Sequence, residues 1–333
     1  MPSQILHILF GEDVIAEIYS RIKGRFAPEA HRALAKISGD YGAAFALGCQ
    51  GPDIFYHNRQ TRPVALEYGT LLHRRSYGDF TAGLLKRGLS EGIGALSVYV
   101  LGFMTHAALD RFCHPYIVYK SVTLPKPGAA RSALERYAHP FFERIIDVLM
   151  LALLRSKAAA SWDGAAMLAE ICKRPPQGLK EMLIRNLRDC FPERAEGDIK
   201  LERRIDNTFA DTASFYRGTA LDYFHPETLP LDIDYLNLRR DLWFYPAGEE
   251  REDRRSFPDI YAQAVKAAAD SLSVFIVQYF ERGIFPIEEI ARSIGNSGLS
   301  VQDENGKPCA VTRTCPLPLE RVIEQQERVR QQY

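Results

Sequence analysis

The chain has 333 residues, 46% of them hydrophobic, which is enough for one large domain or two ordinary domains with a sizeable core. Lys and Arg together number 42, as do Asp and Glu, and this zero net charge argues against a specific nucleic-acid-binding protein or a polybasic membrane patch. No run of about 18 apolar residues is free of charge, and the first residues resemble no secretory signal, so we expect a cytoplasmic protein without a membrane-spanning helix.

The first quarter of the chain alternates helical patterns with short breaks. A short apolar lead containing His7 precedes an amphipathic helix over residues 11–23, and a second helix follows over residues 28–38. Residues 41–49 are small and apolar and predict a buried helix. A Gly-Pro pair then enforces a turn, which places Asp53 in a rigid loop directly after that buried segment.

Two long helices come next. Residues 63–87 predict a helix with His73 about midway, and residues 90–116 predict the central helix, with Ser90 as its N-cap. The stretch VYVLGFMTHAALDRFCHPY within the second helix is apolar nearly all round, which is typical of a buried helix. Three polar side chains interrupt it at positions i, i+4 and i+8, on one face: His106, Asp110 and His114.

A buried Asp beside buried imidazoles is costly unless it is paired or bound to a metal ion. Both His and Asp are zinc ligands, and an i,i+4 spacing lets two side chains on a helix reach one ion. A hydrogen-bonded His–Asp pair in an ordinary core explains the pattern equally well. This helix alone leaves both interpretations open.

A loop over residues 121–128 leads to another long helix over residues 129–157, which carries His139, Glu143 and Asp147 at the same i, i+4, i+8 spacing. We expect Asp147 either to support a ligand or to form an ordinary salt bridge. The remaining predicted elements are helices over 162–172, 177–190, 198–224 and 257–282, a small hairpin over 299–314 and a charged helix over 319–332. The pattern predicts an all-α fold, with one multi-helix domain over residues 1–295 and a hairpin-containing appendage over residues 296–333.

Eight candidate metal ligands fall within the first 143 residues: His7, Asp53, His73, His106, Asp110, His114, His139 and Glu143. Helical proteins build metal sites from inward-facing side chains on several helices. Zinc takes about four ligands, so eight would close two sites completely. Shared among three ions, with Asp110 as a bridge, they leave room for water and substrate, and clustered zinc ions suit the cleavage of phosphate esters.

The ordered set of His7, GPDIFY, His73, HAALD, His114-Pro115 and HPFFE resembles the bacterial zinc-dependent phospholipase C family, which is similar in fold and metal site to single-strand-specific fungal nucleases. The resemblance covers residues 4–147 well and continues weakly through LWFYP at residues 242–246 and SFPDIYAQA at residues 256–264. It implies a phosphodiesterase that uses two to three zinc ions and a metal-activated water, with a phospholipid or another phosphodiester as substrate and transient contact with a membrane surface.

By this resemblance, Asp53, His73 and His106 hold one zinc ion, with Asp110 shared. The resemblance also implies that His114, His139 and Glu143 bind the second ion. It assigns the third ion to His7 and Asp110. Asp53 borders the reacting phosphate in such enzymes and is the candidate for orienting the attacking water. The resemblance leaves open whether Asp53 is the general base.

Three departures from the family pattern matter. Secreted members supply the N-terminal amine of a mature Trp to the third zinc ion, whereas this sequence starts with Met-Pro, so we expect that ion to be labile. The gap between Asp110 and His114 is tighter than in secreted members, which favours ligation by His114 only if the central helix ends near Cys113. The tail is also too short for the lipid-binding β-sandwich of the secreted toxins.

The leading hypothesis is therefore a zinc-dependent phosphodiesterase resembling phospholipase C. A nuclease or small-molecule phosphodiesterase with the same site is the first alternative, and a metal-stabilised scaffold without turnover is the second. Four cations flank the candidate ligands and are candidates for neutralising phosphate: Arg74, Arg75, Arg111 and Lys120. The polar surroundings of His31 and His57 predict surface or loop positions for both.

Overall fold

The computed structural model describes residues 5–24, 27–89, 94–124, 133–217, 226–248, 251–282 and 285–330. These residues are mostly helical, which confirms the all-α prediction. The α-helices are α1 (Ile5–Arg21), α2 (Ala27–Ser38), α3 (Gly42–Cys49), α4 (Ile54–His57), α5 (Leu66–Arg74), α6 (Tyr77–Gly88), α7 (Ala95–Ser121), α8 (Ala133–Arg155), α9 (Gly164–Lys173), α10 (Leu179–Cys190), α11 (Pro192–Ala195), α12 (Leu201–Arg217), α13 (Phe257–Arg282), α14 (Ile287–Ile294) and α15 (Leu319–Arg330). The described residues also form three short 3₁₀ turns: η1 (Gly51–Asp53), η2 (Ala159–Ser161) and η3 (Pro226–Thr228). A two-stranded antiparallel hairpin pairs β1 (Trp243–Phe244) with β2 (Glu252–Asp253).

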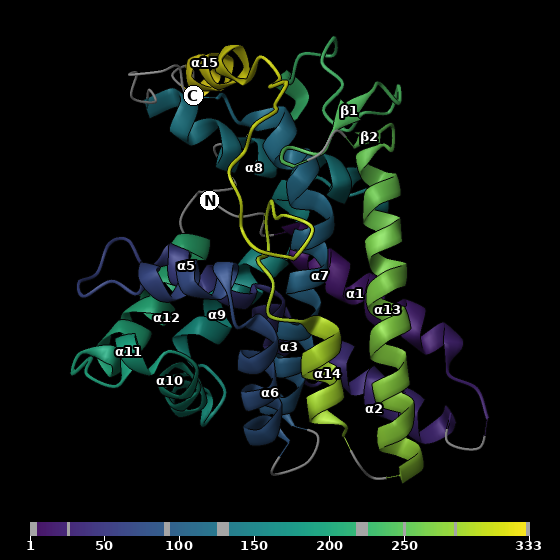
Figure 1. Ribbon diagram of the computed structural model, residues 1–333, viewed down its shortest axis with the longest axis vertical. Helices are drawn as coiled ribbons and strands as arrows, with labels where there is room; N and C mark the ends of the chain where they lie inside the picture. Colours follow the sequence, from purple (N-terminus) through teal and green to yellow (C-terminus); the bar gives the residue numbers. More distant parts are fainter. Residues whose placement is uncertain are drawn as a thin grey trace.

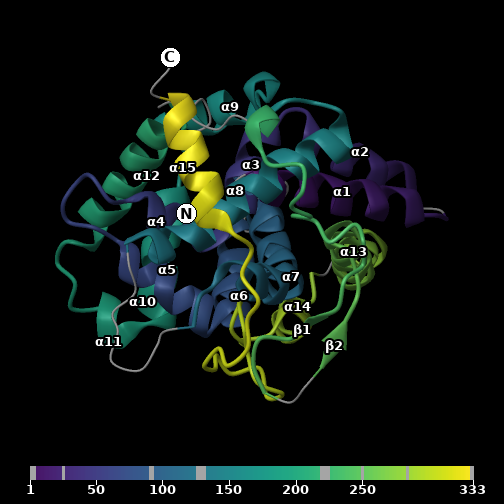
Figure 2. The same ribbon diagram turned by 90° about the horizontal axis from the view of Figure 1, so that it is seen from above.

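The helix α7 runs through the middle of the molecule, as its apolar sequence predicts. It packs against α1, α3, α6, α8 and α13, and most of its side chains are buried. Viewed from above, α7 lies near the centre, with α13 on one side and α10 and α12 on the other (Figure 2). Among the helices that the structure describes, none is long and apolar enough to cross a membrane.

Two glycines bring α3 unusually close to α7. A Cβ atom at Gly48 would lie 2.0 Å from the Tyr99 carbonyl oxygen, and one at Gly102 would lie 2.3 Å from the Phe45 carbonyl oxygen. Neither position accepts a side chain without a shift of the backbone. The close crossing carries the 3₁₀ turn after α3, and Asp53 with it, onto the polar face of α7.

The structure corrects three sequence-based boundaries. The helix α1 begins at Ile5, so His7 lies within the helix rather than in a lead before it. The single helix expected over residues 63–87 is split into α5 and α6, because Ser76 adopts a left-handed conformation with φ 61°. The central helix runs on through Pro115 to Ser121 instead of ending at residue 116, and its expected cap at Ser90 lies outside the described residues.

The C-terminal part of the chain returns to α7. Residues 295–318 run from α14 to α15 as an extended segment across the face of the molecule shown in Figure 1, where it is drawn in yellow. The hairpin expected over residues 299–314 is reduced to one antiparallel bridge, between Gln302 and Pro308. The domain boundary at residue 295 stays a prediction, and main-chain hydrogen bonds join this segment to α7 at Tyr119 and Lys120.

Candidate metal centre

The structure brings all eight predicted ligands together along one face of α7. We define the inner group as His7, Asp53, His73, His106 and Asp110, and the outer group as His114, His139 and Glu143. The inner group is assembled from four segments, namely α1, η1, α5 and α7, whereas the outer group needs only α7 and α8. The helical i,i+4 spacing accounts for the pairs within α7 and within α8, and the fold accounts for the rest.

In the inner group, the two carboxylates face the Nε2 atoms of three imidazoles. The Nε2 atom of His73 lies 3.1 Å from Asp53 Oδ1, and that of His106 lies 3.2 Å from Asp110 Oδ2. The Nε2 atom of His7 lies between the two carboxylates, 3.7 Å from Asp53 Oδ2 and 3.4 Å from Asp110 Oδ1. The rings of His7 and His106 are stacked, with their centroids 4.0 Å apart.

Several of these polar atoms are buried without a hydrogen bond inside the described part of the chain. They are both carboxylate oxygens of Asp53, Oδ2 of Asp110, Nε2 of His106 and Nδ1 of His7. An unsatisfied buried polar group costs about 1–3 kcal/mol, and more when it is charged. Such a concentration of unsatisfied nitrogen and carboxylate oxygen atoms fits a bound cation, because imidazole and carboxylate are the donors that zinc prefers.

The other ring nitrogen, Nδ1, is already occupied in four of the five imidazoles. The partners, with their distances from Nδ1, are the carbonyl oxygens of Gly69 for His73 (2.8 Å), Cys49 for His106 (3.2 Å) and Leu299 for His114 (3.0 Å), and the Ser121 hydroxyl for His139 (3.0 Å). Each bond to a carbonyl makes Nδ1 the protonated nitrogen and leaves the Nε2 lone pair free toward the carboxylates. Ser121 accepts in the same way, since its own hydroxyl donates to the Ile117 carbonyl. This is the arrangement that orients histidine ligands around metal ions.

The outer group is joined to the inner group through Asp110. The Nε2 atoms of His114 and His139 lie 3.2 Å and 3.3 Å from Glu143 Oε1, and His114 Nδ1 lies 3.7 Å from Asp110 Oδ1. The expectation that His114 reaches this group only if α7 ends near Cys113 is therefore wrong. The helix continues, and His114 reaches Glu143 from within it.

The three groups of donor atoms that are close enough to share an ion differ in part from those that the resemblance implied. Their members, each within 4.8 Å of the others, are His7, Asp53 and His106; His73, His106 and Asp110; and His114, His139 and Glu143. The third group matches the implied ligand set. In the inner group, His106 belongs to both combinations, and His7 lies near Asp53 as well as Asp110.

The pKa shifts of the histidines show that a bound cation would replace protons at this centre. Burial alone would lower the pKa of His114, but the carboxylates of Asp110 and Glu143 outweigh this effect and raise that pKa to about 10. Burial lowers the pKa of His106, and the neighbouring His7 lowers it further. The ligands must release their protons for a metal ion to bind, so protons and metal ions compete for this centre.

Asp147 supports the centre without facing it. Its buried carboxylate accepts hydrogen bonds from the backbone N–H groups of Ile5, at 3.2 Å, and Leu6, at 2.9 Å. These N–H groups belong to the first turn of α1, where a carboxylate is stabilising. Asp147 thus holds the start of α1, and with it His7, against α8. The first four residues of the chain lie outside the described residues, and so does the expectation drawn from the missing terminal ligand.

The four flanking cations have different surroundings. Arg75 pairs with Glu193, Lys120 lies over the Tyr119 ring, and Arg111 donates to main-chain carbonyls. Arg74 is exposed and lines a pocket of about 240 Å³ together with His73 and Tyr56. The opposite wall of this pocket comes from the C-terminal segment: Ser300, Val301, Pro308, Cys309 and Val311.

The surface or loop position expected for His57 is wrong. His57 is buried at the end of α4, its ring stacks on Phe215 at 4.4 Å, and burial lowers its pKa to about 4. Its polar sequence neighbours gave no signal of this packing. His31 lies at an intermediate depth and stacks on Tyr19.

One family model, described as zinc dependent phospholipase C, matches residues 6–183, just over half of the chain. All eight candidate ligands lie within the matched residues. Neither a curated protein nor a solved structure matches the chain.

Proposed function

The chain belongs to the zinc-dependent phospholipase C family, a family of phosphoric diester hydrolases, and we propose that it hydrolyses the head-group phosphodiester of a glycerophospholipid. The observation that carries this proposal is the cluster of unsatisfied, buried imidazole and carboxylate atoms at the centre of the family-matched region. Zinc ions bound there supply activation of water and neutralisation of phosphoryl charge.

The chain contributes ligands for two to three ions. We assign one ion to the outer group and the remainder to the inner group, where Asp110 bridges two ions. Its two oxygens support this role because they face different imidazoles: Oδ1 lies 3.4 Å from His7 Nε2, and Oδ2 lies 3.2 Å from His106 Nε2.

We assign Asp53 the role of ligand and of the group that orients the attacking water. Its two oxygens face different histidines, Oδ1 facing His73 and Oδ2 facing His7. The carboxylate lies directly behind His73, whose side chain is 15% exposed and opens onto the 240 Å³ pocket. A phosphate that enters through this pocket reaches His73 before it reaches any other member of the inner group.

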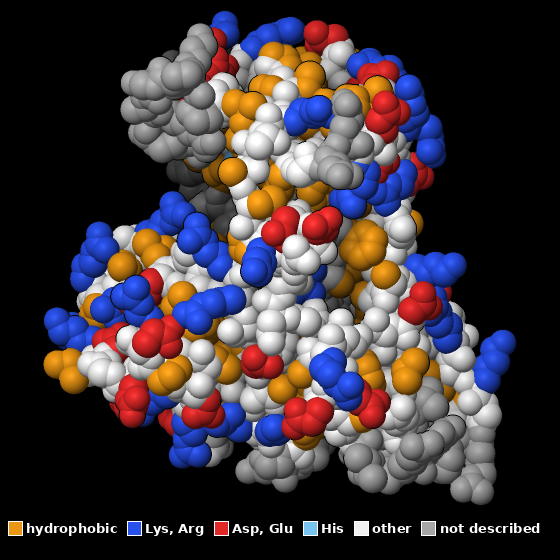
Figure 3. Space-filling view, viewed as in Figure 1, with side chains coloured by type: hydrophobic (Ala, Val, Ile, Leu, Met, Phe, Trp, Pro, Cys, Tyr) orange, Lys and Arg blue, Asp and Glu red, His pale blue; other side chains and the backbone are white. Residues whose placement is uncertain are grey.

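The pocket beside His73 suits an amphiphilic phosphodiester. Arg74 supplies positive charge at its rim, whereas Val301, Pro308 and Val311 offer apolar surface on the other wall. The face of the molecule shown in Figure 3 carries Lys and Arg side chains interspersed with Asp and Glu, rather than a continuous basic track of the kind that follows a nucleic acid backbone. This distribution favours a lipid or small phosphodiester over a polynucleotide.

The first experiment is metal analysis of protein purified without chelator. We expect two or three equivalents of zinc, and less than one equivalent of any transition metal would contradict the proposal. A substrate panel of phosphatidylcholine, single-stranded DNA and bis-p-nitrophenyl phosphate then identifies the substrate class. Cleavage of phosphatidylcholine supports the proposal, cleavage of DNA alone supports the nuclease alternative, and a metal-loaded protein without turnover supports the scaffold alternative.

We also propose the cytoplasm as the compartment. All six cysteines lie within the described residues and are free thiols, as expected in a reducing environment.

A further inference from the structure

A segment outside the family-matched region contacts the candidate metal centre. We name residues 294–301 the strap. Its carbonyl oxygens surround the guanidinium group of Arg111, which lies on α7 next to Asp110 in the sequence. Arg111 donates to the carbonyls of Ile294, Gly295 (3.2 Å), Ser297 (3.0 Å) and Gly298 (3.1 Å).

The strap touches both groups of the metal centre through the main chain of Leu299. The Leu299 carbonyl oxygen lies 3.0 Å from Nδ1 of His114, in the outer group. The Leu299 N–H donates to the His73 carbonyl oxygen at 2.9 Å, in the last turn of α5. A single residue of the strap therefore fixes the ring of one candidate ligand and the backbone of another.

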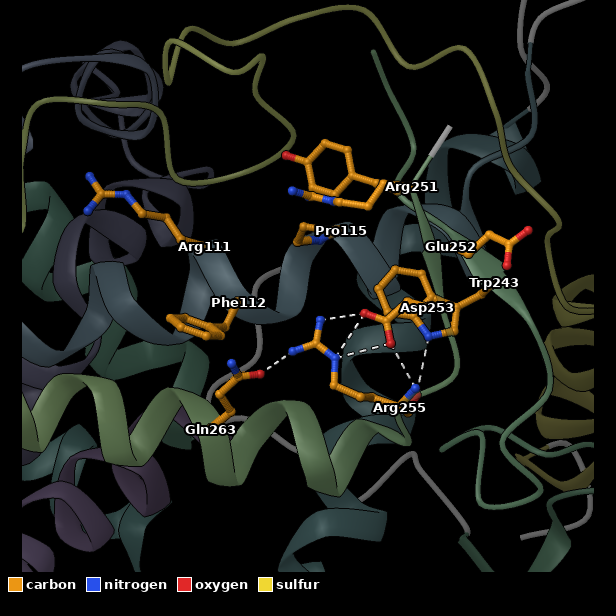
Figure 4. A pocket seen from close by; sticks show the side chains of 10 residues that line it. Arg111, Phe112, Pro115, Trp243, Arg251, Glu252, Asp253, Arg255 and Gln263 are labelled. Carbon is orange, nitrogen blue, oxygen red and sulfur yellow. Dashed lines mark hydrogen bonds and ion pairs between the residues drawn. The ribbon is translucent and has the colours of Figure 1, made fainter. Parts of the chain in front are cut away.

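Arg111 also borders a second pocket, of about 440 Å³, together with Phe112 and Pro115 of α7. Figure 4 shows its side chain pointing away from the ion pair of Arg255 with Asp253 in that pocket. The four carbonyl bonds show that the guanidinium is committed to the strap rather than to the pocket. A main-chain loop folded around one planar, multidentate cation is well defined in position, because Arg presents five N–H donors in a fixed geometry.

We infer that Arg111 is a positioning residue for the metal centre, which acts by holding the strap so that Leu299 orients His114 and fixes the end of α5 at His73. This inference rests on the proposed function in one respect, since it takes the outer group to be a metal site. The bond to Leu299 keeps the proton of His114 on Nδ1 and its Nε2 lone pair toward Glu143. Without the strap, the imidazole is free to rotate and to change tautomer.

The test compares Arg111→Ala with a matched control, Arg87→Ala. Arg87 is also partly buried and donates to the Gly83 carbonyl and to Asn186, but it does so on α6 and α10, away from the strap. Zinc affinity is measured by competition with a chromophoric chelator, and the visible absorption spectrum is recorded on the cobalt-loaded protein. We expect Arg111→Ala to lower the affinity for one zinc ion by about 10–100-fold and to change the absorption spectrum of the cobalt-saturated protein. We expect Arg87→Ala to leave both the affinity and the spectrum unchanged.

Two further variants keep the inference testable if Arg111→Ala does not fold. Arg111→Lys keeps the charge but loses the planar fork, so we expect an intermediate affinity. Asn296→Ala removes the two hydrogen bonds between the strap and Asp79 while leaving Arg111 in place, and we expect a weakening of a few-fold for the same ion.

The outcomes separate this inference from the proposed function. Wild-type protein that binds no metal contradicts the proposed function. Wild-type protein that binds zinc, with unchanged affinity and an unchanged cobalt spectrum in Arg111→Ala, contradicts the role of the strap alone. Equal weakening in Arg111→Ala and Arg87→Ala also contradicts it, because a general loss of stability then explains the effect.

Discussion

The inner and outer groups of the metal centre differ in how deeply their polar atoms are buried. In the inner group, three of the four carboxylate oxygens of Asp53 and Asp110 are buried without a hydrogen bond from the described residues. In the outer group, Glu143 Oε1 has imidazole nitrogens at 3.2 Å and 3.3 Å, and the His139 side chain is 30% exposed. In both groups the Nε2 lone pairs of histidines face carboxylate oxygens, so both need a cation, but the unsatisfied atoms of the inner group are more deeply buried than those of the outer group.

This difference predicts unequal consequences of mutation. A change in the inner group alters the binding of more than one ion, because His106 and Asp110 each lie within reach of several candidate ligands. A change in the outer group affects one ion. The largest effect is therefore expected at Asp110, an inner-group ligand that also contacts His114 of the outer group, and the smallest at a residue outside both groups.

The largest effect is expected for Asp110→Asn, which keeps the shape of the side chain but removes its charge. Cations on either side of residue 110 then repel each other more strongly. We predict the loss of at least one equivalent of zinc and a decrease in kcat of about 100-fold or more. Asp206→Asn, an exposed aspartate paired with Lys180, is the control. Wild-type metal content with near-normal turnover would show that Asp110 is not a bridge.

The next effect concerns Asp53→Asn, for which metal content and activity distinguish two roles. If Asp53 is a ligand as well as the group that orients water, the variant loses zinc from the inner group and loses most of its activity. Full zinc content with a similar loss of activity assigns Asp53 to proton transfer or water orientation alone. Full zinc content and full activity would remove Asp53 from the site.

A smaller loss is expected for Glu143→Gln. The outer group loses its only carboxylate, so its ion is released, while the inner ligands lie on other segments and keep theirs. We predict one equivalent less zinc and a decrease in kcat of about 10–100-fold. Loss of all zinc in this variant would show that the two groups form a single cooperative site and would contradict the comparison.

Much of the centre could be predicted from the sequence, because helical spacing places His106, Asp110 and His114 on one face before any fold is known. The order of motifs then pointed to the family, which the family match confirms. The strap could not be predicted, because its contacts to His114 and His73 use main-chain atoms of Leu299. Every residue has the same N–H and C=O groups except proline, which lacks the N–H, so residue type does not indicate such contacts. The break at Ser76 was equally hidden, since a serine with positive φ follows from tertiary packing rather than from local preference.

His7→Ala tests whether the inner group holds a separate, weaker ion. The sequence offered two ligands for it, His7 and a share of Asp110, and the structure adds Asp53 at 3.7 Å from His7 Nε2. We predict that zinc titration of the variant shows one labile equivalent fewer than wild type and that the other ions are retained. Identical stoichiometry and affinity in both proteins would identify His7 as a core histidine.

The smallest effect is expected for Arg74→Ala, which lies outside both groups. Arg74 is exposed at the rim of the pocket beside His73, and no hydrogen bond or ion pair with another described residue engages its guanidinium group. A cation in such a position attracts substrate phosphate without contacting the metal ligands, and an exposed charge contributes only modestly. We therefore predict an increase in KM of a few-fold, with little change in kcat and full zinc content.

The matched control is Arg75→Ala, at the neighbouring position. Because the Arg75 guanidinium already pairs with Glu193, we expect this variant to leave KM unchanged. Because the effect is electrostatic, the KM of wild type should rise with ionic strength more steeply than that of Arg74→Ala. Equal KM values for wild type and Arg74→Ala at low ionic strength would place the substrate phosphate elsewhere in the pocket.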